Sequence, residues 1–256
     1  MERTKPTILI VHGGYFLPPA WSHFISSLNA AGFEAHCPRL PTCGDDRPPT
    51  KTIKDDVNAI HTAATELASA GKKIIVLAHS YGGIPASEAI PPSLYAFNSD
   101  NGGGVIHIIY LSCWLVLKSS SLEKIIEKYG FQSRVEVGFN EDGTAYAKNA
   151  AATFYNDVQP HSRAEELAKQ NVTHNWSAVG GSVEGVPWMD LPTTYVHCEK
   201  DQAILVGLQR SMVEDAREAL EGKGSLTTET LDAGHCPFLS MPDEVMKFVT
   251  KVADGG

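Results

Sequence analysis

Short apolar runs and amphipathic segments alternate along this chain. Runs rich in Ile, Val and Leu and bounded by turn residues predict buried strands, whereas apolar residues three and four apart predict helices packed on one face. The clearest helix spans residues 52–70 and ends before Gly71, as helices often do. The predicted strands are 7–11, 34–38, 73–78, 105–111, 193–197 and 227–231, and the other predicted helices are 20–31, 205–220 and 242–252. This alternation predicts a doubly wound α/β fold with a mostly parallel sheet.

One long interval interrupts the alternation. Residues 113–190 lie between two predicted strands and form too long a segment for a simple crossover. They contain helix-like pieces at 121–129 and 162–171 together with scattered aromatic residues. We therefore expect residues 1–112 and 191–256 to form the α/β core, and 113–190 to form an inserted cap over the carboxyl edge of the sheet.

Composition narrows the classes of protein that this chain can be. Its 256 residues suffice for one large domain, and its formal net charge of −9 argues against binding to nucleic acid or to an anionic membrane surface. The five cysteines show no paired spacing, so we expect reduced thiols. No signal-peptide pattern and no membrane-spanning apolar run is present, which favours the cytoplasm.

The most specific motif follows the strand predicted at 73–78. The sequence Ala-His-Ser-Tyr-Gly-Gly at 78–83 places Ser80 between two small residues, Ala78 and Gly82. A sharp turn of this kind between a strand and a helix exposes the serine hydroxyl, and it needs small neighbours because the two elements crowd together. The motif therefore predicts that Ser80 is a catalytic nucleophile.

A serine nucleophile needs a histidine to accept its proton and a carboxylate to orient that histidine. In doubly wound hydrolases the chain order is Ser, acid, His. Asp201 follows the strand at 193–197, and His235 follows the strand at 227–231. Because the carboxyl ends of parallel strands gather at one edge, both side chains can converge on Ser80. Glu199 is the alternative acid, although it lies nearer to the end of its strand.

Acyl transfer also requires N–H donors for the oxyanion of a tetrahedral intermediate. One expected donor is the backbone N–H of Tyr81, directly after the nucleophile. The other is expected in the loop after the first strand, His-Gly-Gly-Tyr at 12–15. Gly14 is the preferred residue there and Tyr15 the near alternative, since the glycines let this loop approach a ligand closely.

Large side chains in the cap and beside the catalytic loops are candidates for the wall of a substrate pocket. About half of them are expected to touch a ligand, because most large aromatic residues pack in cores. The candidates are Tyr15, Phe16, Trp114, Phe139, Tyr146, Phe154, Trp176 and Met241. Histidines and acids show no ligand spacing, so no metal is expected.

Together these motifs resemble the α/β-hydrolase superfamily, in particular its small-esterase branch of plant methylesterases and related fungal and bacterial hydrolases. The matching segments are His-Gly-Gly at 12–14 with Trp21 downstream, Ala-His-Ser-Tyr-Gly-Gly at 78–83, Cys-Glu-Lys-Asp at 198–201 and Ala-Gly-His-Cys-Pro-Phe at 233–238. The resemblance covers nearly the whole chain except 113–190. It implies a cofactor-independent serine hydrolase with an eight-stranded type of sheet shortened at its N-terminus. Ala78 departs from the first elbow glycine, and alanine is common there in this branch.

The expected activity is hydrolysis of a small, fairly apolar carboxylic ester or lactone. Two alternatives stay open. The same fold and site could catalyse carbon–carbon cleavage, a lyase reaction or a cyclisation in secondary metabolism, because fold does not determine function. The site could also belong to a ligand-binding receptor with negligible turnover. A lysine or aspartate of the cap aimed at Ser80 would favour the first alternative, and steady turnover of p-nitrophenyl acetate would exclude the second.

Overall fold

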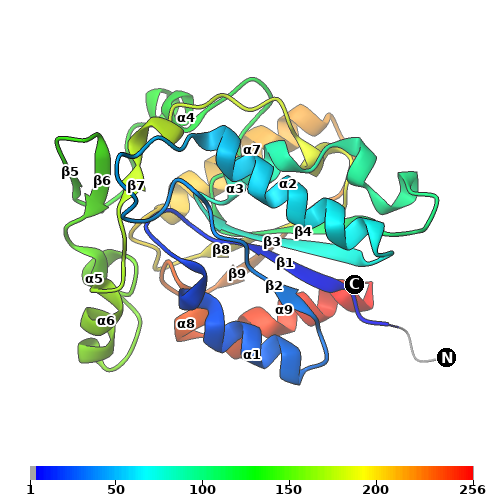
Figure 1. Cartoon of the computed structure of the whole chain (residues 1–256), viewed down its shortest axis with the longest axis horizontal. Coiled ribbons are helices and arrows are strands. Elements are labelled where there is room, and N and C mark those ends of the chain that lie inside the picture. Colours follow the sequence, from blue (N-terminus) through cyan, green and yellow to red (C-terminus); the bar gives the residue numbers. More distant parts are fainter. Residues whose placement is uncertain (1–3, 256) are drawn as a thin grey trace.

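A six-stranded parallel sheet forms the centre of the computed structural model, which describes residues 4–255 (Figure 1). Its strands lie in the order β2-β1-β3-β4-β8-β9, and every neighbouring pair is parallel. The strands are β1 (Thr7–Val11), β2 (Ala35–His36), β3 (Lys73–Ser80), β4 (Gly104–Cys113), β8 (Thr193–Cys198) and β9 (Leu226–Leu231). The predicted doubly wound α/β fold is therefore confirmed.

Helices cover both faces of this sheet (Figure 1). On one face lie α2 (Ile53–Ser69), α3 (Gly83–Ala89) and α7 (Val206–Leu220), and on the other lie α1 (Ser22–Ala30), α8 (Pro237–Ser240) and α9 (Pro242–Asp254). Successive residues of a strand point to opposite faces. Accordingly Ile74 and Val76 of β3 belong to the first apolar core, whereas Ile75 and Leu77 belong to the second. Burial on both faces explains why the central strands are continuous apolar runs.

The segment between β4 and β8 lies at the end of the sheet where the parallel strands finish (Figure 1). It consists of α4 (Leu122–Tyr129), β5 (Val137–Phe139), β6 (Thr144–Ala147), α5 (Ala150–Thr153), α6 (His161–Ala168) and β7 (His174–Asn175). Helices α4 and α6 correspond to the two helix-like pieces in the sequence. The antiparallel sheet β5-β6-β7 was not predicted, because strands of two to four residues carry too little periodicity.

Most element boundaries agree with the sequence prediction to within three residues, and the differences have local causes. Strand β3 continues to Ser80, two residues beyond the expected end, so the nucleophile motif belongs to the strand itself.

The described residues form six strands in the main sheet. Short 3₁₀ helices join the larger elements: η1 (Pro18–Trp21), η2 (Pro92–Leu94), η3 (Ala96–Asn98), η4 (Trp176–Ala178) and η5 (Pro187–Met189). Within residues 4–255, no helix is long and apolar enough to cross a membrane.

Candidate active site

The turn between β3 and α3 holds Ser80 in an unusual backbone conformation. Its φ is +53°, in the left-handed region that non-glycine residues rarely adopt. Such strain costs about 1–3 kcal/mol and persists where the surrounding structure enforces it. Gly82 is needed for the same turn, because a Cβ there would lie 2.4 Å from the carbonyl oxygen of Val11 and 2.5 Å from that of His12. The local sequence thus builds the sharp elbow that its small residues predict.

Ser80, His235 and Asp201 lie in a continuous series of hydrogen bonds. The Ser80 Oγ is 3.0 Å from Nε2 of His235, and Nδ1 of His235 is 2.9 Å from Oδ2 of Asp201. The His235 and Asp201 side chains are buried. With Nδ1–H donated to Asp201, the free Nε2 lone pair faces the serine hydroxyl. This arrangement can remove a proton from Ser80 when the hydroxyl attacks an electrophile.

The Asp201 carboxylate accepts several further hydrogen bonds. Its Oδ1 accepts from the backbone N–H groups of Ala203, at 2.7 Å, and Ile204, at 3.0 Å. Its Oδ2 accepts from Nε2 of Gln209, at 3.0 Å, and from the hydroxyl of Ser112. These donors satisfy the oxygens of a buried carboxylate and hold it in place beside His235. Neither Gln209 nor Ser112 was expected, because they come from α7 and the end of β4 and share no motif with Asp201.

Glu199, the alternative acid, points away from this network. Its carboxylate pairs with the guanidinium of Arg210 at the surface. Asp201 was preferred in the sequence because it lies farther into the loop after β8. Its contact with His235 agrees with that preference. Asp201 and His235 are brought together and Glu199 is not.

The loop after β1 passes close to the nucleophile. A Cβ on Gly13 would lie 2.9 Å from Cβ of Ser80, so only glycine allows this approach. Gly14 and Tyr81 line the same cavity as Ser80, and within the described chain neither of their backbone N–H groups has a hydrogen-bond partner. Within the described residues, the backbone N–H of Tyr15, the alternative donor, likewise has no hydrogen-bond partner. Tyr81 with either Gly14 or Tyr15 can therefore supply the pair of oxyanion donors.

Buried histidines surround the elbow and remain neutral. His12 accepts from the backbone N–H of Leu40 at 3.0 Å and lies 2.8 Å from the Gly13 carbonyl, so it orders the loop after β1. His79 bonds the carbonyl of His235 at 2.8 Å. Burial lowers the pKa of His12 to about 4 and that of His79 well below its usual value. Both histidines are therefore uncharged, and they hold the loops around the elbow in place through their hydrogen bonds.

Because of these histidines, we expect stability to fall as the pH drops from about 6.5 to 4. Burial also lowers the pKa of His174 to about 3 and that of His107 to about 4, so between these pH values the unfolded chain binds more protons than the folded one. Burial raises the pKa of Asp56 to about 6, so between about pH 4 and 6 the folded chain holds one proton more at this group than the unfolded chain does. This single proton offsets only part of the uptake by the four histidines. Urea unfolding at several pH values should show a net uptake of roughly three protons at pH 5.

His107 provides the matched variant for this prediction, because it lies on β4 and bonds Thr194 rather than any residue of the elbow. His107→Gln should reduce the proton uptake by roughly one. A free energy of unfolding that is constant between pH 7 and 5 would contradict the prediction.

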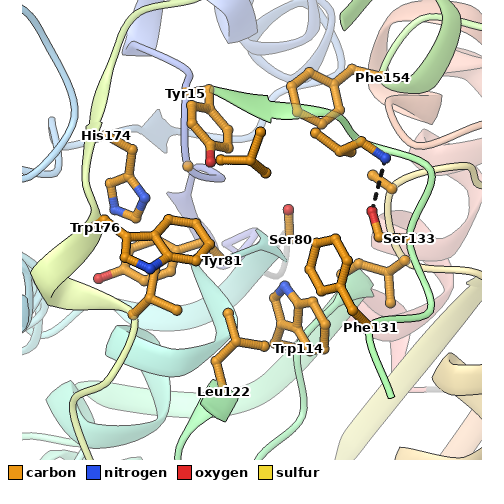
Figure 2. Close-up of a pocket in the computed structure, with 16 residues that line it drawn as sticks. Tyr15, Ser80, Tyr81, Trp114, Leu122, Phe131, Ser133, Phe154, His174 and Trp176 are labelled. Carbon is orange, nitrogen blue, oxygen red and sulfur yellow. Dashed lines mark hydrogen bonds between the residues drawn. The ribbon is translucent and has the colours of Figure 1, made fainter. Parts of the chain in front are cut away.

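A mainly apolar cavity opens above Ser80 (Figure 2). About 550 Å³ of space lies within its walls, and this figure includes the open solvent at its mouth. Its walls come from the elbow, the loop after β1, the cap and the loop after β8. They comprise Gly14, Tyr15, Ser80, Tyr81, Trp114, Leu122, Phe131, Ser133, Val135, Val137, Phe154, His174, Trp176, Val179, Ala203 and Ile204.

Half of the expected pocket residues line this cavity, namely Tyr15, Trp114, Phe154 and Trp176. The other four do not line this cavity. Phe16 is buried in the core behind the cavity wall, and Met241 packs against the same core. Phe139 on β5 and Tyr146 on β6 are 58% and 38% exposed. Residue type alone could not separate these positions, because the fold of the cap decides which aromatic side chains turn inward.

Phe131 and His174 also line the cavity, although the sequence pattern did not single them out. Phe131 stands at the mouth and is 48% exposed. His174 comes from β7 of the cap and is 2% exposed, with its ring against the wall formed by Tyr15 and Tyr81. A lone histidine in a two-residue strand belongs to no sequence pattern, so its position in the cavity wall could not be predicted.

Comparison with known proteins agrees with the fold. Residues 8–248 match the model of the "Alpha/beta hydrolase family". The α/β hydrolase nvfD of Aspergillus novofumigatus is 29% identical over 255 residues, which cover 97% of each chain. Methylesterase 7 of Arabidopsis thaliana is 24% identical over 276 residues, covering 99% of this chain and 98% of the relative. The crystal structure of polyneuridine aldehyde esterase has the same fold, with a TM-score of 0.74 at 18% identity over 98% of this chain and 100% of that one. With the parallel sheet, the serine elbow and the family match over residues 8–248 together, the chain belongs to the α/β-hydrolase family.

Proposed function

We propose that this protein is a serine hydrolase that cleaves small, fairly apolar carboxylic esters or lactones. The observation that carries the proposal is the hydrogen-bonded series Ser80–His235–Asp201 at the base of an apolar cavity. Hydrolases and methylesterases among its relatives support the same chemistry. Its substrate is a small molecule, and the free thiols of all five cysteines are in keeping with a reducing compartment such as the cytoplasm.

In the proposed first half-reaction, Ser80 Oγ attacks the carbonyl carbon while His235 Nε2 takes the hydroxyl proton. Asp201 keeps Nδ1 of His235 protonated and stabilises the cation that forms. The N–H groups of Gly14 and Tyr81 bind the oxyanion of the tetrahedral intermediate, and one such donor is worth about 2.7–4 kcal/mol. When the intermediate collapses, His235 returns the proton to the departing alcohol, and an acyl-Ser80 ester is left.

In the second half-reaction a water molecule replaces the alcohol. His235 takes a proton from this water, and the resulting oxygen attacks the acyl-Ser80 carbonyl. Collapse of the second intermediate returns the proton to Ser80 and releases the carboxylic acid. No cofactor enters either step, because the histidine handles each proton in turn.

The cavity lining favours ester hydrolysis over the lyase alternative. A lyase or a carbon–carbon cleaving enzyme would be supported by a lysine or aspartate of the cap aimed at Ser80. Among the described residues that line the cavity, none is a lysine or an acid. The apolar walls suit an uncharged ester whose carbonyl is the one strongly polar group that must be bound.

Two measurements test the proposal. The protein should turn over p-nitrophenyl acetate and simple methyl esters steadily over many cycles, which a ligand-binding receptor would not do. A fluorophosphonate probe should label Ser80 and no other residue, because the Ser80 hydroxyl lines the cavity and lies 3.0 Å from Nε2 of His235. An active protein that resists the probe, or a label at another residue, would overturn the assignment of the nucleophile.

A further inference from the structure

We propose that His174 is a specificity-determining residue that accepts a hydrogen bond from a hydroxyl group on the ester. The proposal rests on the ester hydrolysis proposed above and narrows its substrate class to hydroxylated esters or lactones. It stands on a buried series of polar contacts behind the cavity wall, which runs from Asp56 through Thr42 to His174.

Asp56 begins the series on α2, and it is fully buried. Its carboxylate accepts from the backbone N–H of Thr42 at 2.9 Å and from the Thr42 hydroxyl at 2.6 Å. It also accepts from the Tyr81 hydroxyl at 2.9 Å. Three donors converge on this one group, so at neutral pH it acts as an acceptor and takes the single hydrogen of the Thr42 hydroxyl.

This arrangement determines which nitrogen of His174 carries the proton. Nε2 of His174 lies 3.1 Å from Oγ1 of Thr42. Because the Thr42 hydrogen is already donated to Asp56, Oγ1 can only accept, and Nε2 must be the donor. The ring is neutral, since burial lowers its pKa to about 3. The other nitrogen, Nδ1, therefore carries a lone pair and no hydrogen.

Nδ1 is available to a ligand. Within residues 4–255 it has no hydrogen-bond partner, and the residue lines the cavity. A Cβ built on Gly14 would lie 3.2 Å from this nitrogen, so it stands beside the loop expected to bind the oxyanion. Figure 2 shows the ring on the cavity wall opposite Phe131, with Ser80 between them. A hydroxyl on the part of the substrate that lies against Gly14 would meet it.

The surroundings make this nitrogen selective. An acceptor without a partner in an apolar cavity is costly once a ligand excludes water, so a ligand that satisfies it is preferred over one that does not. Unlike Nδ1, the nearby indole nitrogens of Trp114 and Trp176 can only donate, so they cannot accept a hydroxyl hydrogen.

The test compares esters that differ in one group. The reference is methyl 3-phenylpropanoate, and its partners carry a hydroxyl or a methoxy group at C2 or C3. For at least one position, kcat/KM for the hydroxy ester should exceed that of the reference by about tenfold. The methoxy ester should lose this advantage, because it has no hydrogen to donate. Equal values for the hydroxy, methoxy and reference esters at both positions would overturn the proposal.

Variants then assign the preference to His174. His174→Phe should bring the hydroxy-to-reference ratio close to one, whereas His174→Asn should keep part of it, because the asparagine oxygen can occupy the place of Nδ1. Phe131→Leu on the opposite wall should leave the ratio unchanged. A ratio that survives His174→Phe would contradict the proposal. In the folded wild-type protein, ¹⁵N NMR of the ring should show the Nε2–H tautomer, and an Nδ1–H tautomer would likewise contradict it.

Failure of the proposal and failure of the proposed function give different results. If the wild-type protein hydrolyses the reference ester but shows no hydroxyl preference, the role of His174 is wrong and ester hydrolysis stands. If it hydrolyses none of the esters, the proposed function fails, and binding of the same esters to Ser80→Ala by calorimetry still measures the preference. Tighter binding of a hydroxy ester would support the role of His174, and equal binding would contradict it.

Discussion

Replacing Ser80 by alanine is expected to lower kcat/KM for ester hydrolysis by roughly 10³-fold or more. The Ser80 hydroxyl lines the cavity and lies 3.0 Å from Nε2 of His235, the proposed base, so it is the group expected to form the covalent acyl intermediate. Without it, water must attack the ester directly, and only the oxyanion donors and substrate binding remain to assist. The strained backbone at position 80 is retained by the surrounding turn, so the fold should persist.

The measurement is steady-state hydrolysis of p-nitrophenyl acetate by the purified variant, with thermal unfolding as a check that it is folded. Ser26→Ala is a suitable control, because Ser26 is an exposed helical serine that bonds the carbonyl of Ser22. It should keep the wild-type activity. If Ser80→Ala retained activity within a few-fold of wild type, another nucleophile or a different mechanism would have to carry the reaction.

Asp201→Asn is expected to cost roughly 10³–10⁴-fold in kcat. The carboxylate accepts the Nδ1–H of His235 and so leaves Nε2 free to take the Ser80 proton. An amide nitrogen at the same place would donate instead, and His235 would turn to the tautomer with its proton on Nε2. That tautomer cannot act as the base. The loss should therefore appear mainly in kcat, with a smaller change in KM.

Glu199→Gln is the matched control, because Glu199 is the second acid of the same loop and pairs with Arg210 at the surface. Its activity should stay within about twofold of wild type, as an exposed ion pair contributes little. Single-turnover measurements of acylation would locate the loss in Asp201→Asn. If Glu199→Gln lost activity and Asp201→Asn did not, the acid of the site would be Glu199.

Local patterns in the chain suffice to predict the nucleophile motif and the main sheet. The elbow at Ser80 can be recognised from neighbouring residues alone, because its sharp turn requires small side chains at 78 and 82. Asp201 and His235 needed one further rule, that parallel strands end at the same edge. The helix at 52–70 and the central strands follow from periodicity, since burial on one face or both leaves a repeat in the sequence.

The cap did not follow from such patterns. Its strands are too short for a period to show, and whether Phe139 points outward or Trp176 inward depends on how the β5-β6-β7 sheet sits over the core. The partners of Asp201 show the same limit, because Ser112 reaches it from 89 positions away. Contacts of this kind leave no repeat in the chain.

The sequence by itself determined the α/β architecture and predicted the candidate nucleophile and the order of its two candidate partners, because these depend on backbone geometry and on burial that recurs at regular spacing. Only the tertiary structure decided which side chains line the cavity and which tautomer His174 adopts. That tautomer depends on Asp56 and Thr42, which meet the cap histidine across more than a hundred positions of chain. The physical reason is that hydrogen bonds are set by distance in space, whereas a sequence pattern reports only distance along the chain.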